Sequence, residues 1–148
     1  MMPLMAQSLQ KFRQIVFQLL YSRSFPGVSD ELSLVIRQNA IPKKQAREAL
    51  ARVNAIAEKI PEFDKLIEAK AIDYELDRIS KIELSILYLG LFELLYTDLP
   101  DKVAISEAVR LSRKFSTREA AAFVNAILDA IFKERSIDGA ISTEQVTC

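Results

Sequence analysis

The chain has 148 residues, no formal net charge and 50% hydrophobic residues, a composition that suits a single domain with a buried core. Its one cysteine, at position 148, excludes a disulfide within the chain, and the absence of histidine removes the most common metal ligand and general base. We therefore expect a protein that is not an enzyme and uses no cofactor and no metal. Residues 1–10 lack the pattern of a signal peptide, and residues 85–96, the longest apolar stretch, are too short to span a bilayer. A cytoplasmic location with no membrane partner is expected.

Apolar residues at helical spacing predict the first helix over residues 6–23. Its expected core stripe is Leu9, Phe12, Val16, Leu19 and Leu20. A turn is expected at residues 24–29, which contain a proline and a glycine, and a short helix at residues 30–39. No stretch of the chain alternates polar and apolar residues as a half-buried strand would, so no sheet is expected.

Two prolines predict where the next helices begin. Pro42 suits the first turn of a third helix, where its missing N–H costs nothing, and that helix is expected to end near Lys59. Pro61 is then expected to open a fourth helix, which ends near residue 71.

A capping-box spacing of Ser80 and Glu83 predicts the start of the most apolar helix, over residues 81–96. Because this helix is hydrophobic almost all round, we expect it at the centre of the domain. The stretch Asp98 to Pro100 then breaks the chain.

Two further helices are expected near the end of the chain. The first covers residues 102–114, and Ser116 with Glu119 repeats the capping-box spacing before the second. That last helix is expected to end near Arg135, and residues 136–148 are expected to form a flexible tail because they show little periodicity. The whole pattern predicts an all-α fold, a compact bundle of about seven helices.

The charges are unevenly distributed along the chain. Residues 1–60 carry nine basic and four acidic groups, whereas residues 61–100 carry four basic and nine acidic groups. One interpretation is that the basic end meets a polyanion while the acidic middle meets a basic protein. The other is that these are solvated helix faces that happen to differ.

One stripe of the first helix has the character of a site for single-stranded nucleic acid. At about 100° per residue, five side chains fall together beside the core face: Gln10, Arg13, Gln14, Phe17 and Tyr21. Cations follow the phosphates of a single strand and aromatic rings stack on its bases. The plainer interpretation is that Phe17 and Tyr21 widen the core stripe. Lys11 falls nearly opposite Arg13 and does not serve the same face.

A second basic patch surrounds the expected turn at Phe115 and Ser116. Its members are Arg110, Arg113, Lys114 and Arg118. The N–H groups at the start of the last helix favour phosphate there. Alternatively, these cations only complement the dipole of the preceding helix. The sequence has no glycine-rich phosphate loop, no metal-ligand spacing and no nucleophile–base pair.

A series of short motifs is in the order and spacing of one family. The motifs are Leu20-Tyr21-Ser22, Asp77-Arg78-Ile79, Leu91-Phe92-Glu93-Leu94, Asp98-Leu99-Pro100, Lys102-Val103-Ala104-Ile105-Ser106-Glu107-Ala108-Val109 and Phe123-Val124-Asn125-Ala126-Ile127-Leu128. Over roughly residues 9–132 this series resembles the bacterial transcription antitermination factor NusB family. The resemblance implies one domain over residues 1–135 with two antiparallel helical sub-bundles, at about residues 6–60 and 61–135.

The resemblance also implies a function in transcription antitermination. It implies binding to boxA-like single-stranded RNA, together with the small-subunit ribosomal protein that acts as NusE, within a complex that contains RNA polymerase. By motif position the expected RNA-binding residues are Arg13, Tyr21, Arg118, Glu119, Phe123 and Asn125. The expected partner-binding residues are Phe92 and Glu93.

The chain departs from the family pattern in three places. The family has a cluster of arginines early in the first helix, where this chain has only Lys11 and Arg13. It has asparagine at the position of Ser106 and glycine at the position of Ala126. The first departure keeps a second interpretation open, a protein-interaction adaptor with weak or lost RNA binding. A third is a stand-alone relative of the NusB-like domain of ribosomal RNA cytosine methyltransferases.

Overall fold

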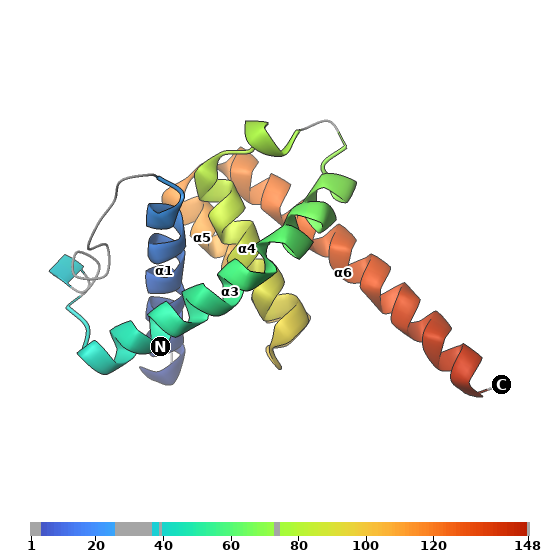
Figure 1. The fold of residues 1–148 in the computed structure, drawn as a ribbon, viewed down its shortest axis with the longest axis horizontal. Coiled ribbons are helices and arrows are strands. Elements are labelled where there is room, and N and C mark those ends of the chain that lie inside the picture. Colours follow the sequence, from blue (N-terminus) through green and yellow to red (C-terminus); the bar gives the residue numbers. More distant parts are fainter. Residues whose placement is uncertain (1–3, 26–36, 39, 73–74, 148) are drawn as a thin grey trace.

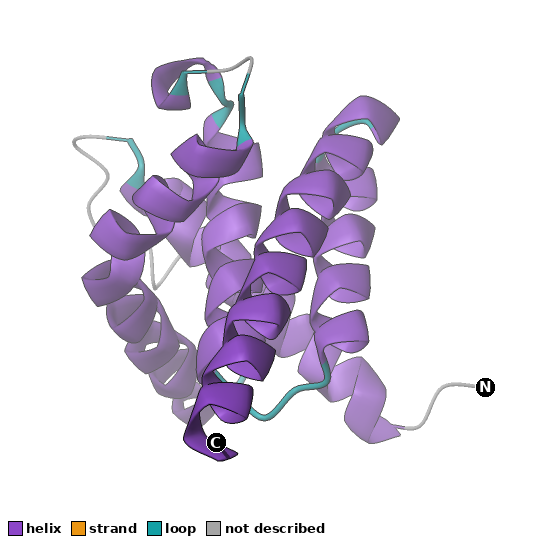
Figure 2. Ribbon diagram, turned by 90° about the vertical axis from the view of Figure 1, so that its right-hand side faces the viewer, coloured by secondary structure: helices purple, strands orange, loops and turns teal. Residues whose placement is uncertain are grey.

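The computed structural model describes residues 4–25, 37–38, 40–72 and 75–147 (Figure 1). In these residues the chain forms five α-helices, one short 3-10 helix and no strand (Figure 2). The elements are α1 (Leu4–Arg23), α3 (Lys43–Lys70), η1 (Leu76–Arg78), α4 (Lys81–Tyr96), α5 (Asp101–Phe115) and α6 (Arg118–Thr147). The all-α prediction is confirmed. The short helix expected at residues 30–39 lies almost wholly outside the described residues.

Helix α4 occupies the centre of the bundle, as its sequence predicts. It packs against α1, α3, α5 and α6 (Figure 1). Its buried residues are Ser85, Ile86, Leu87, Leu89, Gly90, Leu91 and Glu93. Because its neighbours cover it on several sides, α4 has no need of a wide polar face. None of the described helices combines the length and the apolar character needed to cross a membrane.

Helix α3 runs without interruption through Pro61, so the prediction of two helices that meet there is wrong. Proline lacks the N–H that would donate to the carbonyl of Ala57, a loss that costs about 3 kcal/mol in a helix interior. Four side chains on one face of α3 are fully buried on the two sides of the proline: Val53, Ile56, Phe63 and Ile67. Burial of one such side chain contributes about 1.5–3 kcal/mol, so together they outweigh the missing bond. The expected boundary between sub-bundles falls inside α3, and that division stays a prediction.

The predicted capping of α4 is confirmed, and that of α6 is wrong by one residue. The backbone N–H of Glu83 donates to Ser80 Oγ at 3.1 Å. At α6 the cap is Thr117, whose Oγ1 accepts from the N–H of Ala120 at 3.0 Å. Ser116 instead ends α5, because its N–H donates to a carbonyl of that helix. Helix α6 therefore begins directly after residues 116 and 117, the turn between α5 and α6 that the basic patch surrounds. We call this turn the basic turn.

Helix α6 continues to Thr147, well past Arg135, where the sequence predicted its end. Its C-terminal part extends away from the other helices (Figure 1). Residues 136–147 show little apolar periodicity, and for this reason the sequence does not predict their helical state. That it behaves as a flexible tail stays a prediction.

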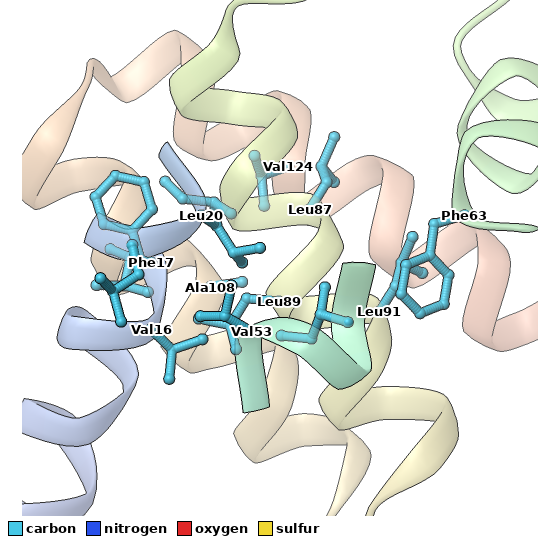
Figure 3. Close-up of a cluster of buried hydrophobic side chains, with 14 of the residues drawn as sticks. Val16, Phe17, Leu20, Val53, Phe63, Leu87, Leu89, Leu91, Ala108 and Val124 are labelled. Carbon is cyan, nitrogen blue, oxygen red and sulfur yellow. The ribbon is translucent and has the colours of Figure 1, made fainter. Parts of the chain in front are cut away.

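The core is built from buried side chains of all five α-helices, and α4 contributes to it on more than one side (Figure 3). Phe17 is 2% exposed and belongs to it, which confirms the plainer interpretation of this residue. Leu9 was expected in the core stripe but is 49% exposed, because the neighbouring helices do not cover that part of α1. At Gly90 the helices approach closely, since an added Cβ would lie 3.0 Å from Leu128 Cδ1.

Candidate nucleic-acid interface

The aromatic stripe of α1 and the basic turn between α5 and α6 lie side by side. Lys114 Nζ donates to Gln14 Oε1 at 2.8 Å, although the two residues are 100 positions apart in the chain. The rings of Phe17 and Phe115 also pack together, with 5.0 Å between their centroids. Two segments that the sequence singled out separately therefore form one continuous surface.

Tyr21 is at the end of α1 within an aromatic cluster. Its ring stacks against Phe17 with a centroid separation of 6.2 Å and meets Phe25 edge-on at 4.9 Å. Tyr21 is half-buried and Phe25 is exposed. The buried Phe17 anchors the cluster, so Tyr21 is held in place and still reaches the surface.

The expected RNA-binding residues of α6 lie along two different grooves. Arg118 and Asn125 line a groove between α5 and α6, with a volume of about 820 Å³. Glu119 and Phe123 line a second groove of about 250 Å³, which also contains residues 78–80 before α4. The start of α6 separates the two grooves, so one nucleic-acid strand that contacts all four residues would have to cross this helix end.

The structure divides the basic patch into three parts. Lys114 faces α1, as described above. Arg110 Nε donates to Glu107 Oε2 at 2.7 Å, and Glu107 also accepts from Gln10 Nε2 at 3.2 Å. Arg113 and Arg118 line the groove between α5 and α6. Among the described residues, carboxylates therefore neutralise only part of the patch.

Arg13 and Glu93 were expected in two different sites, but the structure brings them together. Arg13 Nε donates to Glu93 Oε2 at 2.7 Å, and the two side chains are 9% and 8% exposed. Direct contact of Arg13 with phosphate does not fit this placement, because its charge is buried and already paired. The charge of Glu93 is likewise satisfied within the chain, so its position in an apolar helix does not by itself require a partner protein.

Burial dominates the electrostatics of Glu93. It raises the pKa of this carboxyl above the ordinary value of 4.5, although the hydrogen bond from Arg13 and the charges of Arg13 and Arg52 act to lower it. The charge of Glu107 raises it further. Arg52 also lies over the ring of the half-buried Phe92, 5.0 Å from its centroid. Both expected partner-binding residues are thus covered in part by arginines of the chain itself.

A cleft of about 210 Å³ opens next to this pair. Leu9 and Leu99 line it together with Arg52, and Glu93 contributes to its wall. An apolar side chain would fit such a cleft, with charges of both signs close by. Sequence reasoning missed Leu9 and Leu99 here, and the only available signal was that Leu9 stands where the resembled family has basic residues.

Comparison with known proteins identifies the family. The sequence model of the NusB family matches residues 10–133. The chain belongs to the NusB family. Among curated relatives, the transcription antitermination protein NusB of Ruminiclostridium cellulolyticum is 33% identical over 124 residues, which cover 82% of this chain and 86% of the relative. The NusB of Chlamydia pneumoniae is 36% identical over 132 residues, which cover 87% of this chain and 82% of the relative.

Solved NusB structures share this fold. NusB of T. maritima superposes with a TM-score of 0.72 and 29% identity, over 84% of this chain and 90% of that chain. A chain from the crystal structure of the antitermination factors NusB and NusE in complex with double-stranded RNA superposes with a TM-score of 0.75 and 26% identity. That match covers 86% of this chain and 98% of the other.

Proposed function

We propose that this NusB-family chain is an RNA-binding transcription antitermination factor, which binds boxA-like single-stranded RNA together with the ribosomal protein NusE in the cytoplasm. The observation that carries the proposal is the contact of Lys114 with Gln14, which joins the aromatic end of α1 to the basic turn. The names of the curated relatives and the NusB–NusE–RNA neighbour support the same function.

The proposed RNA surface uses the accessible residues at the start of α6 and at the end of α1. Arg118, Glu119 and Asn125 are exposed, whereas Tyr21 and Phe123 are half-buried. A cation, an amide and aromatic rings suit the phosphates, base edges and base faces of a single strand. Arg13 enters the proposal as a positioning residue, since its pair with Glu93 sets how α1 lies on α4.

The proposed partner surface is the cleft next to the Arg13–Glu93 pair. Leu9 offers exposed apolar area at its rim and Glu93 contributes to its wall, while Phe92 packs against Arg52, which also lines the cleft. Apolar anchors that fill pockets, with charges around them, are typical of the energetically important parts of protein interfaces. NusE would therefore place an apolar side chain in this cleft.

A titration of labelled RNA tests the proposal. Its arms are boxA-like single strands, scrambled strands and duplexes, each measured with and without NusE. Tyr21→Ala should weaken binding by about 1–3 kcal/mol if a base stacks there. Arg118→Ala should flatten the dependence of log affinity on log salt by roughly 0.7. Lys65→Ala, at an exposed position of α3, is the control and should leave both quantities unchanged.

The burial of Arg13 favours one second candidate, a protein-interaction adaptor with weak or lost RNA binding. In that case the chain would bind NusE but none of the RNA probes, even in the complex. Equal affinity for boxA-like and scrambled strands would instead show that the chain binds RNA without a preference for the boxA sequence.

A further inference from the structure

The groove between α5 and α6 has a volume of about 820 Å³. Volumes of this size are typical of small-molecule and cofactor sites. It is lined from α5 by Ser106, Val109 and Arg113, and from α6 by Arg118, Ala122 and Asn125. Only Arg118 and Asn125 of these residues belong to the set of RNA-binding residues that the family resemblance supplied, and none of the residues from α5 does.

The lining of this groove is cationic and contains no carboxylate. Arg113 and Arg118 are exposed, and no ion pair to either is found among the described residues. The adjacent cation Arg110 differs, because Glu107 neutralises it. Two free guanidinium groups on opposite walls of one groove give it a positive potential, which favours a phosphate group.

The remaining lining suits a nucleobase. Val109 from α5 and Ala122 from α6 supply apolar surface on the two sides of the groove, against which a planar ring can lie. Asn125 carries an amide that both donates and accepts, and Ser106 carries a hydroxyl that does the same. A site with an apolar wall, a few polar groups and a cation for phosphate matches the parts of one nucleotide.

The groove also continues the proposed RNA surface. Arg118, which lines the groove, directly follows the turn whose other side reaches Gln14 on α1 through Lys114. A strand that passes from Tyr21 over the basic turn would therefore arrive at the mouth of the groove.

We propose that the groove between α5 and α6 receives one nucleotide of the bound RNA, whose phosphate contacts Arg113 and Arg118 and whose base lies against Ala122 with its polar edge at Asn125. This inference rests on the proposed RNA-binding function. It adds a base-binding site that residues of α5 help to form.

Filling the groove tests the inference. Ala122→Leu places a larger side chain in it, whereas Ala126→Leu makes the same change at an exposed position of α6 that does not line it. With boxA-like single-stranded RNA, Ala122→Leu should weaken binding at least about fivefold, the lower end of the loss expected for one stacked base. Ala126→Leu should change the affinity by less than about twofold.

A series of RNAs with one abasic position each identifies the base. At the position whose base occupies the groove, the abasic change should weaken binding to the wild type. The same change should not weaken binding to the Ala122→Leu variant any further. Arg113→Gln should flatten the salt dependence by roughly 0.7 in log–log slope, and Arg47→Gln, an exposed arginine of α3, should not.

The outcomes separate this inference from the function on which it rests. If the wild type binds RNA but Ala122→Leu binds equally well and couples to no abasic position, the groove is not a nucleotide site and the RNA-binding function stands. If the wild type binds no RNA, with NusE or without it, both are overturned.

Discussion

The guanidinium of Arg13 and the carboxylate of Glu93 form a buried ion pair, with 2.7 Å between Nε and Oε2. The pair joins α1 to the central helix α4. Both residues also line the proposed partner cleft, and changes at either of them act first on the packing of these helices. Functional tests at these two positions therefore need a measurement of stability beside them.

Removal of one member of the pair should be costly. Arg13→Met leaves Glu93 as an uncompensated buried charge, and we expect a loss of about 3–5 kcal/mol in the free energy of unfolding. The double variant Arg13→Met with Glu93→Leu should recover most of this loss, because it leaves no buried charge. Urea unfolding of the two variants measures both values. A single variant as stable as the wild type would mean that the pair is not buried in solution.

The pH dependence of stability should report the raised pKa of Glu93. The folded protein binds a proton there more tightly than the unfolded chain does. The stability that Glu93 contributes to the folded state is thus fully present at a pH below its ordinary pKa of 4.5. It is lost as the pH rises through the raised pKa of the folded state. Relative to Glu93→Gln, whose amide oxygen still accepts from Arg13, the wild type should lose stability over that range.

Urea unfolding from about pH 4 to pH 8 checks this expectation. Glu68→Gln, at an exposed position of α3, serves as the control for general effects of pH. A wild type that gains stability relative to Glu93→Gln as the pH rises would show that Arg13 outweighs burial and that the pKa is lowered.

Truncation of one buried side chain of α4 should show that this helix lies at the centre of the bundle. Ile86 is fully buried, and Ile86→Ala should cost about 2–5 kcal/mol because it leaves a cavity in a close-packed core. Ile72 is 89% exposed, so the same change there should stay within about 0.5 kcal/mol. Thermal or urea unfolding compares the two. Similar losses at both positions would contradict the central placement of α4.

Replacement of Pro61 should stabilise the protein, because it lies inside a continuous helix. Pro61→Ala restores the N–H that donates to Ala57, and we expect a gain of about 1–3 kcal/mol. Pro42→Ala is the matched control, since Pro42 is at the N-cap of the same helix, where proline breaks no helical bond. If Pro61→Ala is neutral or destabilising, the helix is interrupted at residue 61 in solution.

Local patterns in the sequence are enough to predict much of this fold. Periodicity predicts α1, the central α4, α5 and the first part of α6. The capping pair Ser80 and Glu83 predicts the start of α4 to the residue. These features depend on neighbours within a few positions along the chain, and such neighbours are visible in the sequence itself. The order of the short motifs likewise indicates the family without any tertiary information.

Tertiary contacts decided the rest. The sequence places Pro61 at a helix start, whereas burial of side chains on both sides of it keeps α3 continuous. It places Leu9 in the core and Arg13 on a surface, but which residue is covered depends on where α3, α4 and α5 cross α1. A helical projection shows which side chains share a face and not which neighbour packs on that face. For the same reason the pairing of Arg13 with Glu93, and the groove that places Arg113 opposite Arg118, become visible only when the helices are packed.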